Sequence, residues 1–125
     1  MIRLLLLSIT SVVALSAADQ PKLAGDWKGE SICLANKPPC TDEKVVYHFA
    51  EPDGSGSVEI SADKIVDGRA IGMGTVKMQY DKNKGTLSAQ GGPRIWRLSI
   101  HGKTMDGTLT VPDNVVMRKV TLTRD

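Results

Sequence analysis

The chain has 125 residues, enough for one domain, and its 16 Lys and Arg against 14 Asp and Glu residues give a formal net charge of +2. Such a small surplus argues against nucleic acid as a partner, because phosphate binding requires clustered Lys and Arg side chains. With 41% hydrophobic residues, 12 glycines and 2 cysteines, the composition indicates a globular domain rich in turns, and it excludes a disordered tail or a disulfide-dense mini-protein.

Residues 1–18 are typical of a secretory signal peptide. One positive charge, Arg3, precedes an apolar stretch that ends in the small residues Ser-Ala-Ala. The stretch is shorter than the roughly 20 apolar residues that a spanning helix needs. We therefore expect export, secreted or periplasmic, with cleavage of the leader. The remaining chain, 19–125, is expected to be a single domain without a membrane span.

Export would place the two cysteines, Cys33 and Cys40, in an oxidising compartment, where a close and even pair predicts a disulfide. The bridge closes a loop of eight residues, for which the chain-entropy model gives about 2.5 kcal/mol. A metal site would need more ligands than two thiols, and the CxxC spacing of redox-active pairs is absent. We expect a structural disulfide and no metal.

Apolar and polar residues alternate with period two along almost all of the remaining chain, and Gly, Pro, Asn or Asp interrupts the pattern at short intervals. The alternation predicts strands at 26–35, 43–50, 58–62, 74–80, 87–89, 96–101, 104–111 and 115–124. Residues 63–73 are either a strand pair that turns at Asp67-Gly68 or an irregular connection. A hairpin turn is expected at 81–85.

Little or no helix is expected, because no run keeps a 3.6-residue apolar period over ten positions. Seven to nine short strands joined by tight turns predict an all-β, antiparallel up-and-down meander, closed as a barrel or packed as a sandwich. Beyond the aromatic residues, the alternation assigns these side chains to the inner face: Val45, Val58, Ile60, Val76, Met78, Leu87, Leu98, Ile100, Leu109, Val111, Val116, Val120 and Leu122.

The segment Leu23-Ala24-Gly25-Asp26-Trp27-Lys28-Gly29 resembles the Gly-x-Trp signature that opens the first strand of lipocalins and related calycins. The resemblance implies an eight-stranded barrel in which the Trp closes one end and a basic residue of the last strand packs over it. Arg124 stands where such a residue would be, with Arg118 as the alternative. A guanidinium over an indole gains about 0.5–2 kcal/mol.

An eight-stranded barrel is just wide enough to be filled by side chains or to hold one small ligand. A filled core is one interpretation. The other is a narrow pocket for a small hydrophobic molecule, lined by Tyr47, Phe49, Met78, Tyr80 and Trp96. Small inward positions such as Gly29, Ser31 and Ala89 would leave it space.

No set of residues in the sequence indicates a catalytic site or a cofactor-binding site. His48 and His101 lie opposite apolar faces and are expected to be solvated, and no serine stands in a nucleophile-elbow context. We therefore expect an exported binding module that is not an enzyme. The alternative is a module that binds an extracytoplasmic protein, for example a protease inhibitor with a filled core and a loose arm over 19–23.

Overall fold

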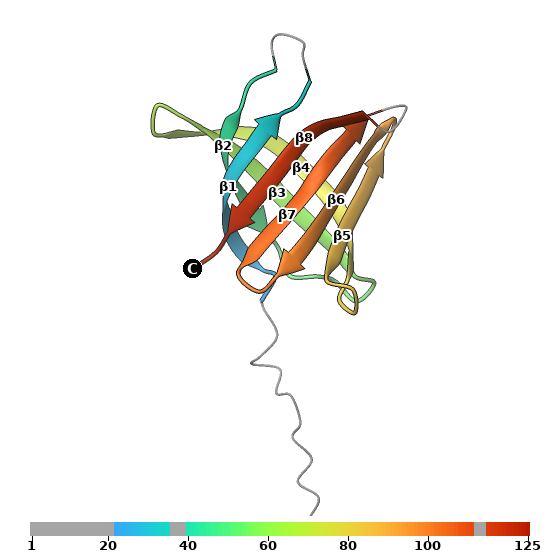
Figure 1. The fold of residues 1–125 in the computed structure, drawn as a ribbon. Coiled ribbons are helices and arrows are strands. Elements are labelled where there is room, and N and C mark those ends of the chain that lie inside the picture. Colours follow the sequence, from blue (N-terminus) through green and yellow to red (C-terminus); the bar gives the residue numbers. More distant parts are fainter. Residues whose placement is uncertain (1–21, 36–39, 112–114) are drawn as a thin grey trace, which may run out of the picture.

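The computed structural model describes residues 22–35, 40–111 and 115–125. It contains eight strands: β1 (Gly25–Cys33), β2 (Glu43–Phe49), β3 (Ser57–Val66), β4 (Arg69–Asp81), β5 (Thr86–Gly91), β6 (Arg94–His101), β7 (Thr104–Val111) and β8 (Val115–Thr123). Each strand pairs antiparallel with the next, and β1 also pairs with β8, so that the sheet closes into a barrel (Figure 1). The predicted all-β meander is confirmed as a barrel. The described residues include no helix that could span a membrane.

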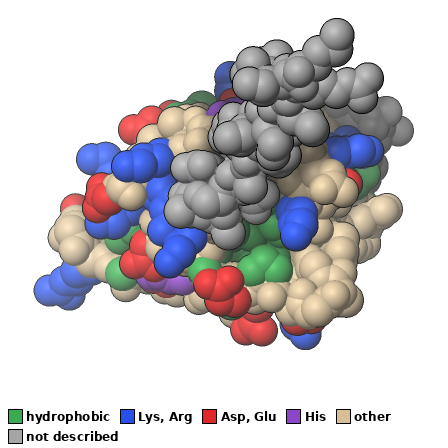
Figure 2. All heavy atoms as spheres, turned by 90° about the horizontal axis from the view of Figure 1, so that it is seen from below, with side chains coloured by type: hydrophobic (Ala, Val, Ile, Leu, Met, Phe, Trp, Pro, Cys, Tyr) green, Lys and Arg blue, Asp and Glu red, His purple; other side chains and the backbone are tan. Residues whose placement is uncertain are grey.

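The two ends of the barrel differ. The chain enters at Lys22 and leaves at Asp125 at one end, which we call the closed end (Figure 1). Figure 2 looks at this end, and its visible part shows Lys and Arg side chains interspersed with Asp and Glu. At the other end, which we call the open end, β1, β3, β5 and β7 end and β2, β4, β6 and β8 begin (Figure 1).

The β3–β4 connection is a hairpin that turns at Asp67 and Gly68, with φ of 50° and 78°. Positive φ at both positions is the requirement of a type I′ turn, whose twist matches that of the flanking strands. Of the two interpretations of 63–73, the strand pair is therefore confirmed. The strand predicted at 58–62 ended too early, because β3 continues to Val66. Residues 63–66 of β3 are at most partly buried and 69–75 of β4 are exposed, so no buried face marks this hairpin.

The contact between β4 and β5 is short. β4 has 13 residues, but it pairs with β5 through three residue pairs, from Gln79 with Ser88 to Asp81 with Thr86. β3, by comparison, pairs with β4 from Ser57 to Val66. Toward the open end, β4 therefore has one strand neighbour, and its inner face can border a cavity there.

The buried core occupies the closed half and reaches the middle of the barrel. Its members are Leu23, Trp27, Val45, Tyr47, Phe49, Val58, Ile60, Met78, Leu87, Leu98, Met105, Val120 and Leu122. Most had been assigned to the inner face from alternation. The assignment of Val116 to the inner face is wrong, because this residue is 38% exposed. A register shift at Leu109/Thr110 pairs Leu109 with Arg118 and Thr110 with Val116, which leaves Met117 as an extra residue and reverses the alternation beyond it.

Candidate functional site

Trp27 and Arg124 seal the closed end. Trp27 is fully buried, and the guanidinium carbon of Arg124 lies 5.2 Å from the centre of its ring. Arg124 also donates hydrogen bonds to the carbonyl oxygens of Lys22 and Ala24. Of the two arginines considered from the sequence, Arg124 is thus the one over Trp27.

Leu23 belongs to this seal. Its side chain is buried, and its carbonyl oxygen accepts a 2.9 Å hydrogen bond from the indole N–H of Trp27. The prediction of a loose arm that includes Leu23 is therefore wrong, because the buried leucine ties the chain to the barrel. The rest of that arm, residues 19–21, and the predicted signal peptide, residues 1–18, lie outside the described residues.

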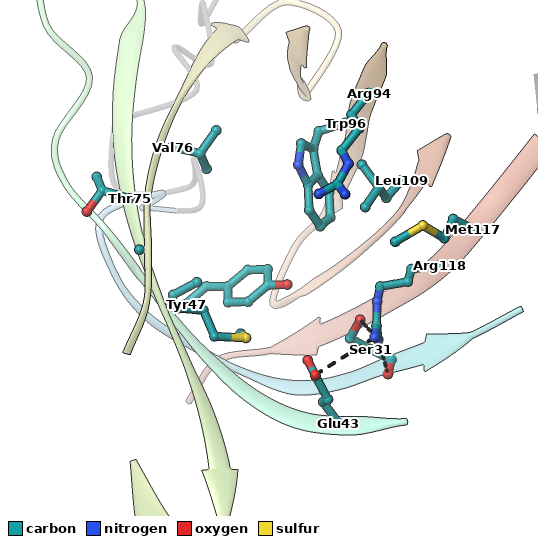
Figure 3. A pocket seen from close by; sticks show the side chains of 13 residues that line it. Ser31, Glu43, Tyr47, Thr75, Val76, Arg94, Trp96, Leu109, Met117 and Arg118 are labelled. Carbon is teal, nitrogen blue, oxygen red and sulfur yellow. Dashed lines mark hydrogen bonds and ion pairs between the residues drawn. The ribbon is translucent and has the colours of Figure 1, made fainter. Parts of the chain in front are cut away.

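A cavity of about 330 Å³ lies in the open half of the barrel (Figure 3). Its walls come from seven of the eight strands, all except β5. The lining residues are Ser31, Glu43, Tyr47, Ala62, Met73, Gly74, Thr75, Val76, Arg94, Trp96, Leu109, Met117 and Arg118. Small-molecule sites generally span about 300–1,000 Å³, so this cavity fits a small ligand.

The five residues predicted to line a pocket divide between the two halves. Tyr47 and Trp96 line the cavity (Figure 3). Phe49 and Met78 are buried in the core, and Tyr80 packs against it. All five side chains share the inward parity of their strands, but parity does not give the height along the barrel axis. That height follows from the strand registers, which the alternation does not specify.

Arg118 lies in the cavity and not over Trp27. One terminal nitrogen, Nη1, donates to the carbonyl and hydroxyl oxygens of Ser31, at 3.3 and 3.1 Å. The other, Nη2, lies 3.8 Å from a carboxylate oxygen of Glu43 and 3.7 Å from the sulfur of Cys40. Its side chain is 14% exposed. Arg118 is therefore a nearly buried cation in the cavity wall.

Sequence reasoning assigned no cavity role to Glu43, Arg94 or Arg118. A signal existed for Arg118, because it shares the inner face of β8 with Val120 and Leu122. A charged residue on an apolar face indicates either a functional site or a buried ion pair. Arg94 carries no comparable signal, since it begins β6 directly after the turn at Gly92-Pro93.

The tyrosine hydroxyl in the cavity stays protonated. Burial, and secondarily the negative charge of Glu43, raise the pKa of Tyr47 to about 12, while Arg118 acts in the opposite direction. Tyr47 is therefore a neutral hydrogen-bond donor at any physiological pH.

The disulfide between Cys33 and Cys40 is present, as predicted. It joins the end of β1 to the segment before β2, at the open end. The backbone N–H of Cys33 donates a 2.8 Å hydrogen bond to Oδ1 of Asp42, which fixes the same connection. A disulfide is compatible with a location outside the cytoplasm. Because Cys40 also contacts Arg118, the bridge helps to position a residue of the cavity wall.

His48 is not simply a solvated residue of the outer face. Its Nδ1 lies 2.6 Å from Oδ1 of Asp26 on β1, and its Nε2 lies 2.8 Å from Oδ2 of Asp63 on β3. Both ring nitrogens can donate only when the imidazole is protonated. Hydrogen bonds to Asp63 and then to Asp26 raise the pKa of His48 above its usual 6.5.

This bridge predicts a pH-dependent stability. Because the folded-state pKa of His48 is raised, its contribution is fully present below pH 6.5 and is lost as the pH rises through the folded-state pKa. The side chain is 40% exposed, so the effect should stay near the 0.2–1 kcal/mol of exposed pairs, about 1–8 °C in melting temperature. Thermal unfolding followed by circular dichroism should show higher stability at pH 6 than at pH 9.

His48→Gln should remove most of that difference. The matched control is His101→Gln, because His101 lies near one carboxylate, that of Asp106 at 3.5 Å, and not between two. Equal pH dependence in the wild-type protein and His48→Gln would contradict the prediction.

The described residues contain no cluster of three or more His, Cys, Asp or Glu side chains that could hold a metal ion. Neither the models of known protein families nor the curated proteins include a match to this chain. The fold therefore defines the class: an eight-stranded antiparallel barrel, consistent with a calycin-like architecture, with one sealed end and a cavity at the other.

Proposed function

We propose that this protein is an exported, lipocalin-like binding module that holds a small hydrophobic molecule at the open end of its barrel. The observation that carries the proposal is the division of the interior. The closed half is filled by Trp27 and the core, whereas the open half keeps a cavity of about 330 Å³. A protein that acts through its surface alone needs no such space, since interiors are ordinarily packed without large voids.

The surface around the cavity supports an apolar ligand. Six large hydrophobic side chains are substantially exposed in the described residues, and all belong to segments at the open end: Leu34, Val66, Ile71, Met73, Val115 and Val116. Met73 also lines the cavity. Exposed apolar groups that gather at one place commonly mark a binding site. Here they would guide a hydrophobic molecule toward the cavity.

The test is a fluorescence titration of the full mature protein with decan-1-ol, a neutral apolar probe. Trp96 lines the cavity, whereas Trp27 is buried under Arg124 at the closed end. We expect a saturable change of tryptophan emission that is lost in Trp96→Phe. No response, together with no binding heat by calorimetry, would contradict the proposal.

Ala62→Phe provides a control for the binding place. Ala62 lines the cavity from β3, opposite Gly74 in the register. A benzyl group there should fill part of the cavity and weaken binding of decan-1-ol, while circular dichroism should show an intact sheet. Unchanged binding in this variant would place the probe elsewhere.

A further inference from the structure

The cation in the cavity wall has hydrogen-bonding capacity that the described residues do not use. A guanidinium carries five N–H donors in a fixed planar arrangement. In Arg118 the close oxygen acceptors are the two oxygens of Ser31, and both bind Nη1, whereas Nη2 reaches only the weakly accepting sulfur of Cys40, at 3.7 Å. The carboxylate of Glu43, at 3.8 Å from Nη2, is beyond hydrogen-bond distance. An ionised carboxylate is a much stronger acceptor for these donors than a sulfur atom.

The charges that line the cavity do not balance. Arg94 and Arg118 contribute two positive charges, and Glu43 contributes one negative charge. Figure 3 shows both guanidinium groups and the Tyr47 hydroxyl among the side chains around the same space. The charges of Arg118 and Glu43 interact more strongly than in water, because their side chains are largely buried and the effective dielectric constant is lower there, whereas Arg94 is exposed and adds a weaker, screened positive charge. One net positive charge therefore favours a ligand with one negative charge.

We propose that the cavity takes a small amphipathic carboxylate, with its head group at Arg118 and its apolar body against Trp96. This inference rests on the proposed function and adds the charge of the ligand to it. The carboxylate would accept hydrogen bonds from the free donors of Arg118 and from the Tyr47 hydroxyl. A guanidinium and a carboxylate match in geometry and can form two parallel hydrogen bonds.

The size of the ligand follows from the cavity. At the packing density of protein interiors, 330 Å³ holds about a dozen non-hydrogen atoms. The apolar part of the wall, which includes Val76, Trp96 and Leu109, suits an alkyl chain or a ring. Decanoate has this size and chemistry, and it is the probe we choose.

The experiment compares three probes with the same ten-carbon chain on the full mature protein by isothermal titration calorimetry. Decanoate is anionic, decan-1-ol is neutral and decylammonium is cationic. We expect decanoate to bind at least about tenfold more tightly than decan-1-ol, the usual effect of hydrogen bonds to a charged group. Decylammonium should bind most weakly.

Three variants locate the effect. Arg118→Gln should reduce decanoate binding about tenfold more than it changes decan-1-ol binding, so that the two affinities become similar. Glu43→Gln should tighten decanoate binding, because it removes the negative charge that competes for Arg118. Lys119→Gln is the matched control: it removes a positive charge from the next position on β8, whose side chain is exposed on the outside. It should leave both affinities unchanged.

The outcomes separate the two proposals. If decanoate and decan-1-ol bind equally and Arg118→Gln alters neither, the carboxylate proposal is wrong and the binding function stands. Tighter binding of decylammonium would also overturn it, since Glu43 would then dominate. If none of the probes binds, the proposed function fails and the carboxylate proposal fails with it. Glu43→Gln keeps Arg118 in place, so it tests the carboxylate proposal even if Arg118→Gln does not fold. Decanoate binding that is not tightened in Glu43→Gln would contradict the proposal.

Discussion

Replacing Trp27 by Ala should destabilise the barrel by about 3–5 kcal/mol, the usual cost of truncating a buried Trp. The side chain is fully buried, its ring centre lies 6.1 Å from that of Phe49, and Arg124 covers it. Truncation would also leave the carbonyl of Leu23 without its indole donor. Since the free energy of unfolding of small domains is about 5–15 kcal/mol, this substitution would remove a large part of it.

The measurement is urea unfolding followed by far-ultraviolet circular dichroism, with Trp96→Ala as the matched control. Trp96 is half-buried and borders the cavity, so one side of its ring already lacks packing partners. Its loss should cost clearly less stability but should abolish the fluorescence response to decan-1-ol. Equal destabilisation by the two variants would show that the seal at the closed end is not the stronger part of the core.

The fold was largely predictable because most strands carry a simple period. β6 and β8 have one apolar face over part of their length, which specifies both their conformation and the side that faces the core. The exceptions have local causes. In the β3–β4 hairpin, residues 69–75 of β4 are exposed and 63–65 of β3 are only partly buried, and the bulge at Met117 interrupts the period. A period cannot be detected where nothing on either face is buried.

The candidate site was less predictable, because it depends on heights along the barrel axis and on charges. Tyr47 and Phe49 point inward from the same strand, two residues apart, yet Tyr47 lines the cavity and Phe49 packs on Trp27. The registers of eight strands separate these positions. The bridge of His48 with Asp26 and Asp63 likewise joins three strands, and no spacing within one strand indicates it.

The absence of a side chain at Gly29 serves the contact between β1 and β8 and not the space for a ligand. From the sequence, its small size was expected to leave space for a ligand. In the structure, a Cβ at Gly29 would lie 1.8 Å from the carbonyl oxygen of Thr121 on β8. Gly107 on β7 faces a similar limit, with a Cβ 2.0 Å from the carbonyl oxygen of Arg97. These glycines permit a close approach of backbones.

Gly29→Ala should therefore destabilise the protein by about 3 kcal/mol or more, at the upper end of the cost of overpacking. The atom in the way belongs to the backbone of β8, which is paired with β1 from Lys28 to Cys33, so relief requires the two strands to separate. That separation would open the barrel at the contact that closes it. Gly107→Ala should act in the same direction at the β6–β7 contact.

The matched control is Gly91→Ala, because no atom lies within 4 Å of a Cβ at that position and its φ is not in the left-handed region. This variant should change the urea midpoint little. If Gly29→Ala and Gly91→Ala unfold at the same midpoint, the close approach of β1 and β8 is not required for the barrel to close. If Gly29→Ala alone loses stability, closure depends on a residue without a side chain at the contact between the first and last strands.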